Sequence, residues 1–511
     1  MPARLRRMFL VAVTMMVVLA TGSDLRADED EAEKLHAFIE QGRKDWSLTG
    51  LALAVVKDDK IVFIRGYGVR DIRTNEPIDE NTVFQLASCS KPLTASGMAL
   101  LVQDGKVEWN TPIIESWPDF QVADPVVTKQ ATLRDILCHR TGVGKGESVL
   151  YYEMPTTRTE LLARLPEVQQ AAPFRTEFRY SNLMYTVAGR VVEQATGESW
   201  DEYMSKRLFQ PLGMTRTYTS MKLLAQTDNV AIPHVGVDKK AFATEFADQD
   251  NIGPAAAVSS CVSDLSQWLL MMVNEGRYQG KQILKPGVVR EMLKPQILMT
   301  FVDPVHGEHF FDAYGLGLML RDYHGQRIAN HAGMAGHSLS ILGFVPEKRV
   351  GVVVLVNHRR CLFHYAVFRR AIDLYCGMPP IDLDSINKKL IADLLASQAD
   401  SLQRRAAARD PSKKPTLPLE SYRGTYKGEG DLLVKLEKDA GGLVLRYGNF
   451  VADVTHWHDD TFRGRLRQRR LADEQDWWLT FTIANGTIAT LHIHSEHDVH
   501  ADFAPVVESG K

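Results

Sequence analysis

The chain has 511 residues, of which 45% are hydrophobic and 24% are charged, and its formal net charge at pH 7 is −3. This composition is typical of a folded globular protein, and the length exceeds that of one ordinary domain. Because the charge shows no basic excess, it gives no reason to expect a nucleic-acid partner. Five cysteines without a Cys-x-x-Cys pair argue against a disulfide framework and against a cysteine-based zinc site.

The first 27 residues are predicted to be a signal peptide. Three arginines precede an apolar run at residues 8–20, which is too short to span a bilayer comfortably. Arg6 and Arg7 also resemble a twin-arginine signal, so both export routes stay open. The mature protein is therefore expected in the periplasm or outside the cell, without a stable membrane anchor.

The following residues alternate between strand and helix patterns. Residues 31–46 predict an amphipathic helix, and the apolar runs at 51–56 and 61–64 predict a β-hairpin, since acidic turn residues separate them. Helical patterns dominate residues 132–224. Later strands are expected at residues 315–320, 327–330, 339–345 and 350–356, before a helix at 363–375.

A serine with a lysine three positions later, Ser88 and Lys91, stands at the head of a helix-compatible run. Positions i and i+3 of a helix share one face, with Cβ atoms roughly 5–6 Å apart. Lys91 can therefore reach the Ser88 hydroxyl and take its proton, which a serine nucleophile needs. Taken alone, this spacing is a weak signal, because chance supplies it in many chains.

Two later segments strengthen the prediction. A Tyr-Ser-Asn segment at residues 180–182 precedes an amphipathic stretch, and a His-Ala-Gly segment at 331–333 precedes an apolar run. These segments follow the motif order of the serine β-lactamase and penicillin-binding protein superfamily. The chain resembles the branch with Tyr-x-Asn second and His-x-Gly third, which includes class C β-lactamases, DD-peptidases, D-aminopeptidases and β-lactamase-like carboxylesterases. The resemblance covers about residues 30–375.

The resemblance implies a fold and a mechanism. The fold is α/β (α+β), an antiparallel sheet flanked by helices, with a helical subdomain and the site in the cleft between them. Ser88 would be acylated, Lys91 would act as the base, and Tyr180 would carry protons between Ser88, Lys91 and the leaving group or attacking water. Asn182 would hydrogen-bond Lys91 and the substrate's amide.

The third motif departs from the lysine of the penicillin-recognising members, whose ammonium lies near the substrate carboxylate. Here His331 takes that place, and histidine has a reference pKa of about 6.5. This favours an ester or amide that needs no permanent cation, with affinity for anionic substrates increasing as pH falls. Gly333 would let substrate approach the strand closely. The backbone N–H groups of Met334 and Ser88 would form the oxyanion hole.

The pattern changes beyond residue 380. Residues 383–408 predict a charged amphipathic helix, and a proline-rich stretch follows. Short strands with glycine-containing turns then predict a small antiparallel β-barrel, and Tyr422-Arg423-Gly424 is similar to the start of the barrel appended to many members of the superfamily. The predicted organisation is a signal peptide at 1–27, a hydrolase domain at 28–380, a helical linker at 381–417 and a C-terminal β-barrel at 418–511.

Two clusters in the last region favour structural explanations. Histidines between residues 456 and 500 lack a standard zinc spacing, so no metal site is predicted. The arginines at 463, 465, 467 and 469 alternate along one strand face. This pattern predicts a solvated edge strand whose charges oppose aggregation.

The sequence therefore predicts an exported serine hydrolase that cleaves an ester or amide through an acyl-Ser88 intermediate, of the carboxylesterase or D-amino-acid peptidase type. The alternatives are a class C β-lactamase and a penicillin-binding protein that turns over slowly. An α/β-hydrolase esterase is disfavoured because the chain lacks a Gly-x-Ser-x-Gly segment. No cofactor or nucleic acid is expected. The expected partner is a small-molecule or peptide substrate, including one derived from the cell wall.

Overall fold

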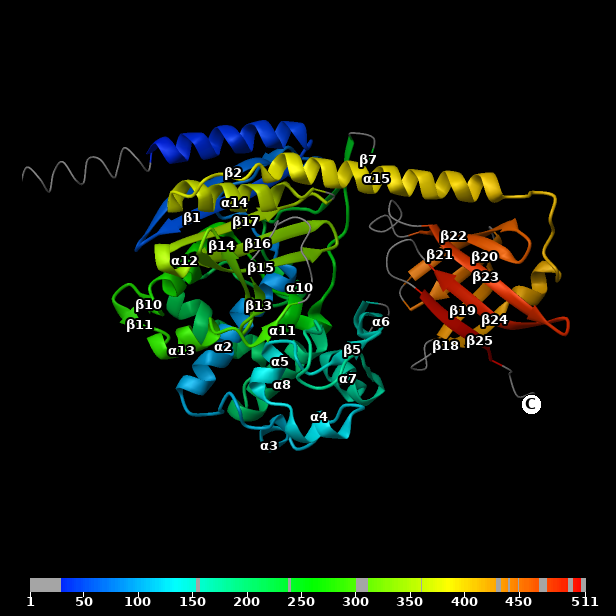
Figure 1. Ribbon diagram of the computed structural model, residues 1–511, viewed down its shortest axis with the longest axis horizontal. Coiled ribbons are helices and arrows are strands. Elements are labelled where there is room, and N and C mark those ends of the chain that lie inside the picture. The colour runs from blue at the N-terminus through cyan, green and yellow to red at the C-terminus, as the bar shows by residue number, and fades with distance from the viewer. Residues whose placement is uncertain are drawn as a thin grey trace, which may run out of the picture.

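The computed structural model describes residues 29–152, 157–237, 240–299, 311–359, 361–428, 433–439, 442–448, 450–467, 476–494 and 500–506. The predicted signal peptide lies outside these ranges. Among the residues within them, no helix is both long and apolar enough to cross a membrane. Figure 1 shows a large body of helices and strands and, along the distal half of the long helix α15 (Leu383–Ala408), a β-barrel.

The large body is built on an antiparallel sheet in which nine strands are described, in the order β12-β13-β14-β15-β16-β17-β1-β2-β3. In chain order they are β1 (Gly50–Lys57), β2 (Lys60–Asp71), β3 (Glu76–Pro77), β12 (Ile297–Leu298), β13 (Asp312–Tyr314), β14 (Met319–Tyr323), β15 (Gln326–Ala335), β16 (Ser338–Val345) and β17 (Val350–Val356). The sheet confirms the predicted fold class. β16 and β17 are buried throughout, because both faces of the sheet centre are covered.

Successive side chains of β1 point alternately into the apolar cores on the two faces of the main sheet. Leu51 and Leu53 pack with α14 (Phe363–Cys376) and the helix over residues 29–45, whereas Ala52 and Ala54 pack with the helices on the opposite face. Successive residues of a strand point to opposite faces of its sheet. The period-two pattern of β1 thus holds a helical layer on each side of the sheet.

The second layer and the helical subdomain contain helices of 4 to 15 residues. They are α2 (Ser90–Gln103), α3 (Ile113–Ser116), α4 (Pro125–Gln130), α5 (Leu133–Leu137), α6 (Glu147–Tyr152), α7 (Arg158–Ala163), α8 (Asn182–Thr196), α9 (Trp200–Met204), α10 (Met221–Leu224), α11 (Gly253–Ala256), α12 (Val262–Val273) and α13 (Pro286–Met292). Figure 1 shows α3 to α8 gathered on one side of the main sheet. The remaining short strands of this body are β4 (Phe84–Gln85), β5 (Val143–Lys145), β6 (Gln169–Gln170), β7 (His234–Val237), β8 (Lys240–Ala243), β9 (Ser259–Ser260), β10 (Arg277–Tyr278) and β11 (Lys281–Gln282).

The strand expected at residues 315–320 exists but begins later, as β14 at Met319. Residues 315–318 instead connect β13 to β14. Gly317 has a φ of +85°, and a Cβ there would lie 2.6 Å from the Ala95 Cβ on α2. Residues 315–318 therefore form a tight connection against α2, although Leu316 and Leu318 are as buried as the residues of a central strand.

The C-terminal region confirms the predicted barrel. Its closed sheet contains β18 (Gly424–Gly428), β19 (Leu433–Asp439), β20 (Gly442–Tyr447), β21 (Phe450–His458), β22 (Thr461–Leu466), β23 (Asp476–Ala484), β24 (Thr487–His494) and β25 (His500–Pro505). Aromatic rings fill the interior, where Tyr422 and Phe462 lie 4.9 Å apart between centroids.

The edge strand predicted from the alternating arginines is wrong. Arg463 and Arg465 lie on β22, which pairs with both β21 and β23. A closed barrel leaves this strand without a free edge. The guanidinium of Arg463 instead contacts the Asp476 carboxylate, and Arg467, just beyond β22, lies 2.6 Å from that of Asp453. Arg469 lies outside the described residues.

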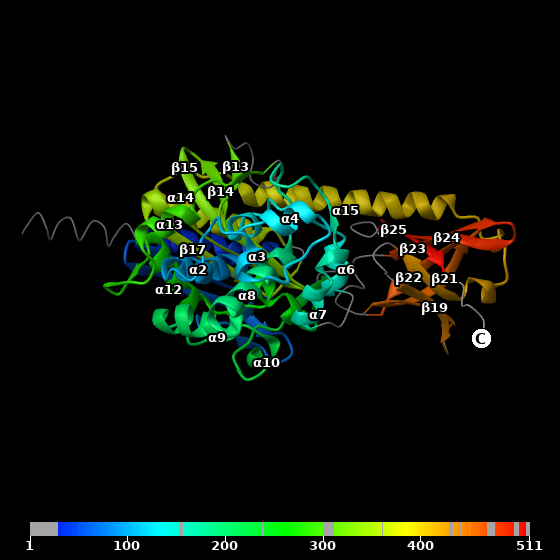
Figure 2. The ribbon, with the colours of Figure 1, turned by 90° about the horizontal axis from the view of Figure 1, so that it is seen from below.

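Helix α15 contacts both bodies. Near its beginning, Asp384 accepts a 2.7 Å hydrogen bond from the Trp46 indole. Near its end, the Arg405 guanidinium lies 4.8 Å from the Trp478 ring centroid of β23. Figure 2, seen at a right angle to Figure 1, again places the barrel beside the distal half of this helix. The helix is thus a connector with specific contacts at each end.

Candidate active site

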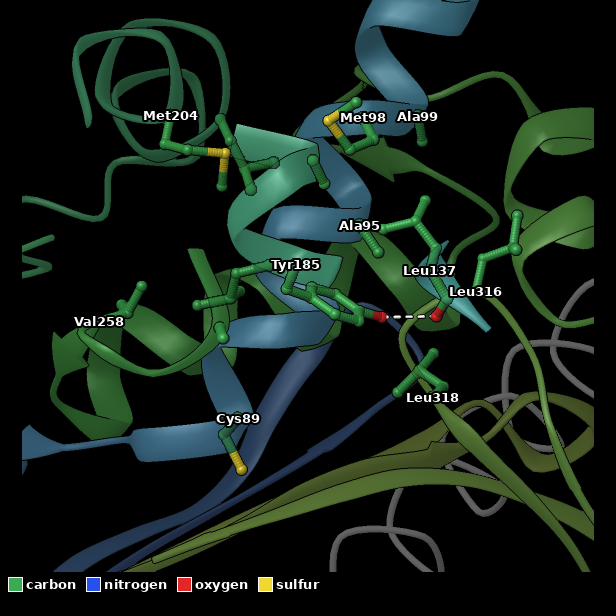
Figure 3. Close-up of a cluster of buried hydrophobic side chains, with 14 of the residues drawn as sticks. Cys89, Ala95, Met98, Ala99, Leu137, Tyr185, Met204, Val258, Leu316 and Leu318 are labelled. Carbon is green, nitrogen blue, oxygen red and sulfur yellow. Dashed lines mark hydrogen bonds between the residues drawn. The ribbon is translucent and has the colours of Figure 1, made fainter. Parts of the chain in front are cut away.

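Ser88 lies in a 3₁₀ turn, Ala87–Cys89, that leads directly into α2. Ala87 has a φ of +47°, which is a strained conformation for a residue with a Cβ. Almost all of α2 is buried, and Figure 3 shows its Ala95, Met98 and Ala99 packed among apolar side chains. The nucleophile predicted from the sequence therefore stands on a rigid base.

The Lys91 amine is completely buried and reaches three oxygen atoms. Its Nζ lies 2.7 Å from Asn182 Oδ1, 3.1 Å from the Ala255 carbonyl oxygen and 3.2 Å from Ser88 Oγ. A neutral amine has two N–H groups and one lone pair. Because both carbonyl oxygens can only accept, they take the N–H groups and leave the lone pair for the Ser88 hydroxyl.

Burial lowers the pKa of Lys91 to about 7. The charged form of a buried amine is disfavoured because it loses its hydration. A substantial fraction of Lys91 is therefore neutral near physiological pH. The geometry and the pKa together suit Lys91 to remove the proton from Ser88, as the motif spacing predicts.

Tyr180 approaches Ser88 from a more exposed side. Its hydroxyl donates a 2.7 Å hydrogen bond to Ser88 Oγ, and Lys91 Nζ lies 4.6 Å from its ring centroid. Tyr180 is 36% exposed, in contrast to the buried Lys91. Its ring packs against His139 at a centroid distance of 4.4 Å. Two proton-carrying groups thus converge on one hydroxyl.

Asn182 is the first residue of α8, and Ser181 caps that helix by accepting a hydrogen bond from the Met184 N–H. Serine is a favoured residue at this position because its oxygen satisfies an unpaired N–H of the first turn. Next to this cap, the Asn182 Oδ1 accepts a hydrogen bond from Lys91 Nζ. The Asn182 Nδ2 also donates a 2.8 Å hydrogen bond to the Tyr151 hydroxyl.

The third motif lies on β15 beside Ser88. Pairing of β14 with β15 ends at Asn330, whereas pairing with β16 continues to Ala335. A Cβ on Gly333 would lie 2.2 Å from the Leu86 carbonyl oxygen and 2.8 Å from the Ser88 nitrogen. Only glycine therefore allows the strand this close to the nucleophile. Met334 follows with 54% of its surface exposed, and the oxyanion hole expected from its N–H and that of Ser88 stays a prediction.

His331 is buried and neutral, which differs from the expectation that it takes up a proton as pH falls. Its Nδ1–H donates to the Ala332 carbonyl oxygen at 2.7 Å, and its Nε2 accepts from the Tyr314 hydroxyl at 2.9 Å. Burial lowers the pKa of His331 to about 3. Since both ring nitrogens are occupied, the side chain holds β15 against β13 and carries no charge at ordinary pH.

Two residues of α6 contact the second motif, although no sequence motif marks them. The Glu147 carboxylate accepts from Ser181 Oγ at 2.5 Å and from the Asn182 N–H at 2.6 Å. Four residues later, Tyr151 contacts the Asn182 amide. Burial raises the pKa of Glu147 to about 7. A single acidic residue in a glycine-containing stretch carries no motif, so only the fold reveals this contact.

Cys89, next to the nucleophile, is an unreactive packing residue. Its Sγ donates to the His331 carbonyl oxygen at 3.1 Å, and burial raises the pKa of its thiol to about 12. Reactive cysteines require an accessible thiolate. All five cysteines are free thiols, and four of them are buried.

Comparison with known proteins gives relatives for both bodies. Residues 408–508 match a domain of unknown function, DUF3471. Unguisins hydrolase ungD of Aspergillus violaceofuscus is 28% identical over 448 residues, covering 81% of this chain and 77% of the relative. Penicillin-binding protein 4 of Amycolatopsis lactamdurans is 28% identical over 327 residues, covering 62% of this chain and 82% of the relative.

A solved structure supports the same fold. The octameric penicillin-binding protein homologue from Pyrococcus abyssi superimposes with a TM-score of 0.61 at 20% identity, covering 92% of this chain and 99% of the homologue. The family model described as Beta-lactamase matches residues 35–371, which include Ser88, Lys91, Tyr180 and His331. The chain therefore belongs to the Beta-lactamase family, within the serine β-lactamase and penicillin-binding protein superfamily.

Proposed function

We propose that this protein is an exported serine hydrolase that cleaves an amide or ester through an acyl-Ser88 intermediate, of the D-amino-acid peptidase or carboxylesterase type. One observation carries this proposal: Lys91 Nζ and the Tyr180 hydroxyl both lie within hydrogen-bond reach of Ser88 Oγ. A hydroxyl with an adjacent base is the arrangement that covalent catalysis requires. Export is proposed from the basic and apolar pattern of residues 1–27.

In the proposed reaction, Ser88 Oγ attacks the substrate carbonyl carbon while Lys91 takes the hydroxyl proton. The oxyanion is stabilised by the backbone N–H groups of Ser88 and Met334. Tyr180 then gives a proton to the leaving group, and the bond between the carbonyl carbon and that group breaks. A water molecule then attacks the acyl carbonyl carbon while Tyr180 takes one of its protons. The bond between that carbon and Ser88 Oγ breaks, Lys91 returns its proton to Ser88 Oγ, and the acid product leaves.

The substrate class is proposed from the third motif. The neutral His331 stands where penicillin-recognising relatives place a lysine, which favours substrates without a carboxylate at that point. The side of β15 beyond Asn330 is not paired with β14, so an extended amide can hydrogen-bond along it. The similarity to a protein named Unguisins hydrolase also supports hydrolysis as the outcome.

The proposal is tested by steady-state kinetics on the mature protein with three substrates: a short-chain nitrophenyl ester, a D-aminoacyl amide and a cephalosporin. We expect turnover of the ester or the amide, with a covalent adduct on Ser88, and slower reaction with the cephalosporin. Rapid cephalosporin turnover would favour the class C β-lactamase alternative. A stoichiometric burst without turnover on any substrate would favour a penicillin-binding protein.

A further inference from the structure

Glu147 begins α6 as a buried carboxylate in contact with the second motif. Its Oε1 accepts from the Asn182 N–H and its Oε2 from the Ser181 hydroxyl, so both carboxylate oxygens hold consecutive residues of this motif. We propose that Glu147 is a positioning residue that fixes Asn182 and supplies the buried negative charge that determines when Lys91 gives up its proton. This inference rests on the proposed function, because it concerns the base of the same site.

The path from Glu147 to the base is short. Glu147 holds the backbone of Asn182, whose Oδ1 accepts a 2.7 Å hydrogen bond from Lys91 Nζ. Tyr151, one helical turn further along α6, contacts the other end of the same amide. Residues four apart on a helix lie on one face. One face of α6 therefore clamps Asn182 at its backbone and at its side chain.

Two opposing effects act on this buried pair. Desolvation favours a neutral amine and a neutral carboxyl, whereas the attraction between Lys91 and Glu147 favours their charged forms. Burial thus lowers the pKa of Lys91 and raises that of Glu147, each to about 7. Where two ionisable groups interact strongly, a measured midpoint belongs to the pair. An isolated ammonium would be costly at a completely buried position.

Five other ionisable groups that face the pair have pKa values shifted in the direction that keeps them neutral at this pH. Burial lowers the pKa of His139 and His331 below the ordinary histidine value, and raises the pKa of the Cys89 thiol and the Tyr185 and Tyr314 phenols. Tyr180 and Tyr151 also face the pair through the contacts described above. The charge opposite Lys91 therefore comes from Glu147.

The test is the pH dependence of Ser88 labelling by a fluorophosphonate probe, followed by intact mass spectrometry from pH 5 to 10. Glu147→Gln removes the charge and keeps the size of the side chain. Without the negative charge, the pKa of Lys91 falls, so the acid midpoint of the labelling rate should move down by about one pH unit. The maximal rate should fall about tenfold or more, because Asn182 is held less well.

Two variants separate charge from shape. Tyr151→Phe removes one contact to Asn182 without a charge change, so it should slow labelling and leave the midpoint in place. Glu147→Asp keeps a charge at a greater distance, so its midpoint should lie below that of the wild type and above that of Glu147→Gln. If Glu147→Gln does not fold, the downward shift of the labelling midpoint in Glu147→Asp tests the inference instead.

The outcomes distinguish this inference from the proposed function. If folded Glu147→Gln keeps the wild-type midpoint, the inference is overturned. If the Gln variant does not fold, a wild-type midpoint in Glu147→Asp overturns it in the same way. In both cases normal labelling of Ser88 would still support the proposed hydrolase. An equal shift in Tyr151→Phe would overturn the inference too, because shape alone would then explain the effect. Failure of the wild type to label at Ser88 would overturn both.

Discussion

The large body and the barrel use ionisable side chains in opposite ways. The body buries Lys91, Glu147 and His331 in or beside the candidate site, and it also buries charged side chains elsewhere, such as Asp135 and Arg369. In the described part of the chain, no charged side chain after Asp373 is buried, and barrel charges such as Arg467 pair at the surface. Burying a charge is costly unless it is paired or its pKa shifts. The body therefore bears the free-energy cost of burying ionisable side chains. The barrel avoids that cost, because its interior is apolar and aromatic and its charges lie at the surface.

Replacing the nucleophile should have the largest effect on activity. Ser88→Ala removes the atom that attacks the carbonyl, so kcat/KM on a nitrophenyl ester should fall by about a thousandfold or more. Thermal unfolding should change little, because the hydroxyl is small and belongs to the site. Rates and the melting temperature are measured on the same preparation. Full activity in this variant, or an adduct on Cys89, would contradict the mechanism.

The two proton-carrying groups should act as one unit. Lys91→Ala and Tyr180→Phe each remove a group in contact with Ser88 Oγ. Effects of such residues are strongly non-additive. The double variant should therefore be little worse in kcat/KM than the worse single variant. Multiplication of the two separate losses would show that Lys91 and Tyr180 work independently.

His331→Lys should change substrate preference more than overall rate. A lysine ammonium near a substrate carboxylate should raise acylation by a carboxylate-bearing β-lactam over a neutral ester by about tenfold to a hundredfold. His331→Gln is the neutral control and should leave the ratio unchanged.

The same ratio tests the protonation state of His331. With a pKa of about 3, the wild-type imidazole stays neutral above that value. The kcat/KM ratio of the two substrates should therefore not rise through His331 protonation between pH 8 and 5.5. A rise that disappears in His331→Gln would show that the imidazole protonates in that range.

Damage to the barrel core should affect activity least. Phe462→Ala leaves a cavity among buried aromatic rings and should destabilise the barrel by about 3–5 kcal/mol, while kcat/KM on a small ester changes less than about twofold. Leu355→Ala in β17 is the matched core variant of the large body and should lower activity and stability together.

A chain that ends at Ala408 should also stay active on a small ester. If that chain folds but is inactive, the barrel contributes a catalytic group.

Local spacing predicted a good part of the site. The i, i+3 relation placed Lys91 beside Ser88, and the second motif supplied Tyr180 and Asn182, which the structure brings to the same hydroxyl. Short apolar runs separated by acidic or glycine-containing turns likewise predicted the hairpin of β1 and β2 and several barrel strands. These features depend on neighbours a few residues apart or on a motif of fixed form, so the sequence displays them directly.

Tertiary packing alone decided the rest. Glu147 reaches Asn182 across 35 positions of chain, and the neutrality of His331 comes from its burial beside Tyr314. Residues 315–318, expected in a strand, form a connection because α2 lies against Gly317. A pKa and a backbone conformation depend on what surrounds a residue in space. The sequence by itself therefore determined that Ser88, Lys91, Tyr180 and Asn182 belong to one candidate site, and the fold determined their burial, their charge states and the partners that hold them.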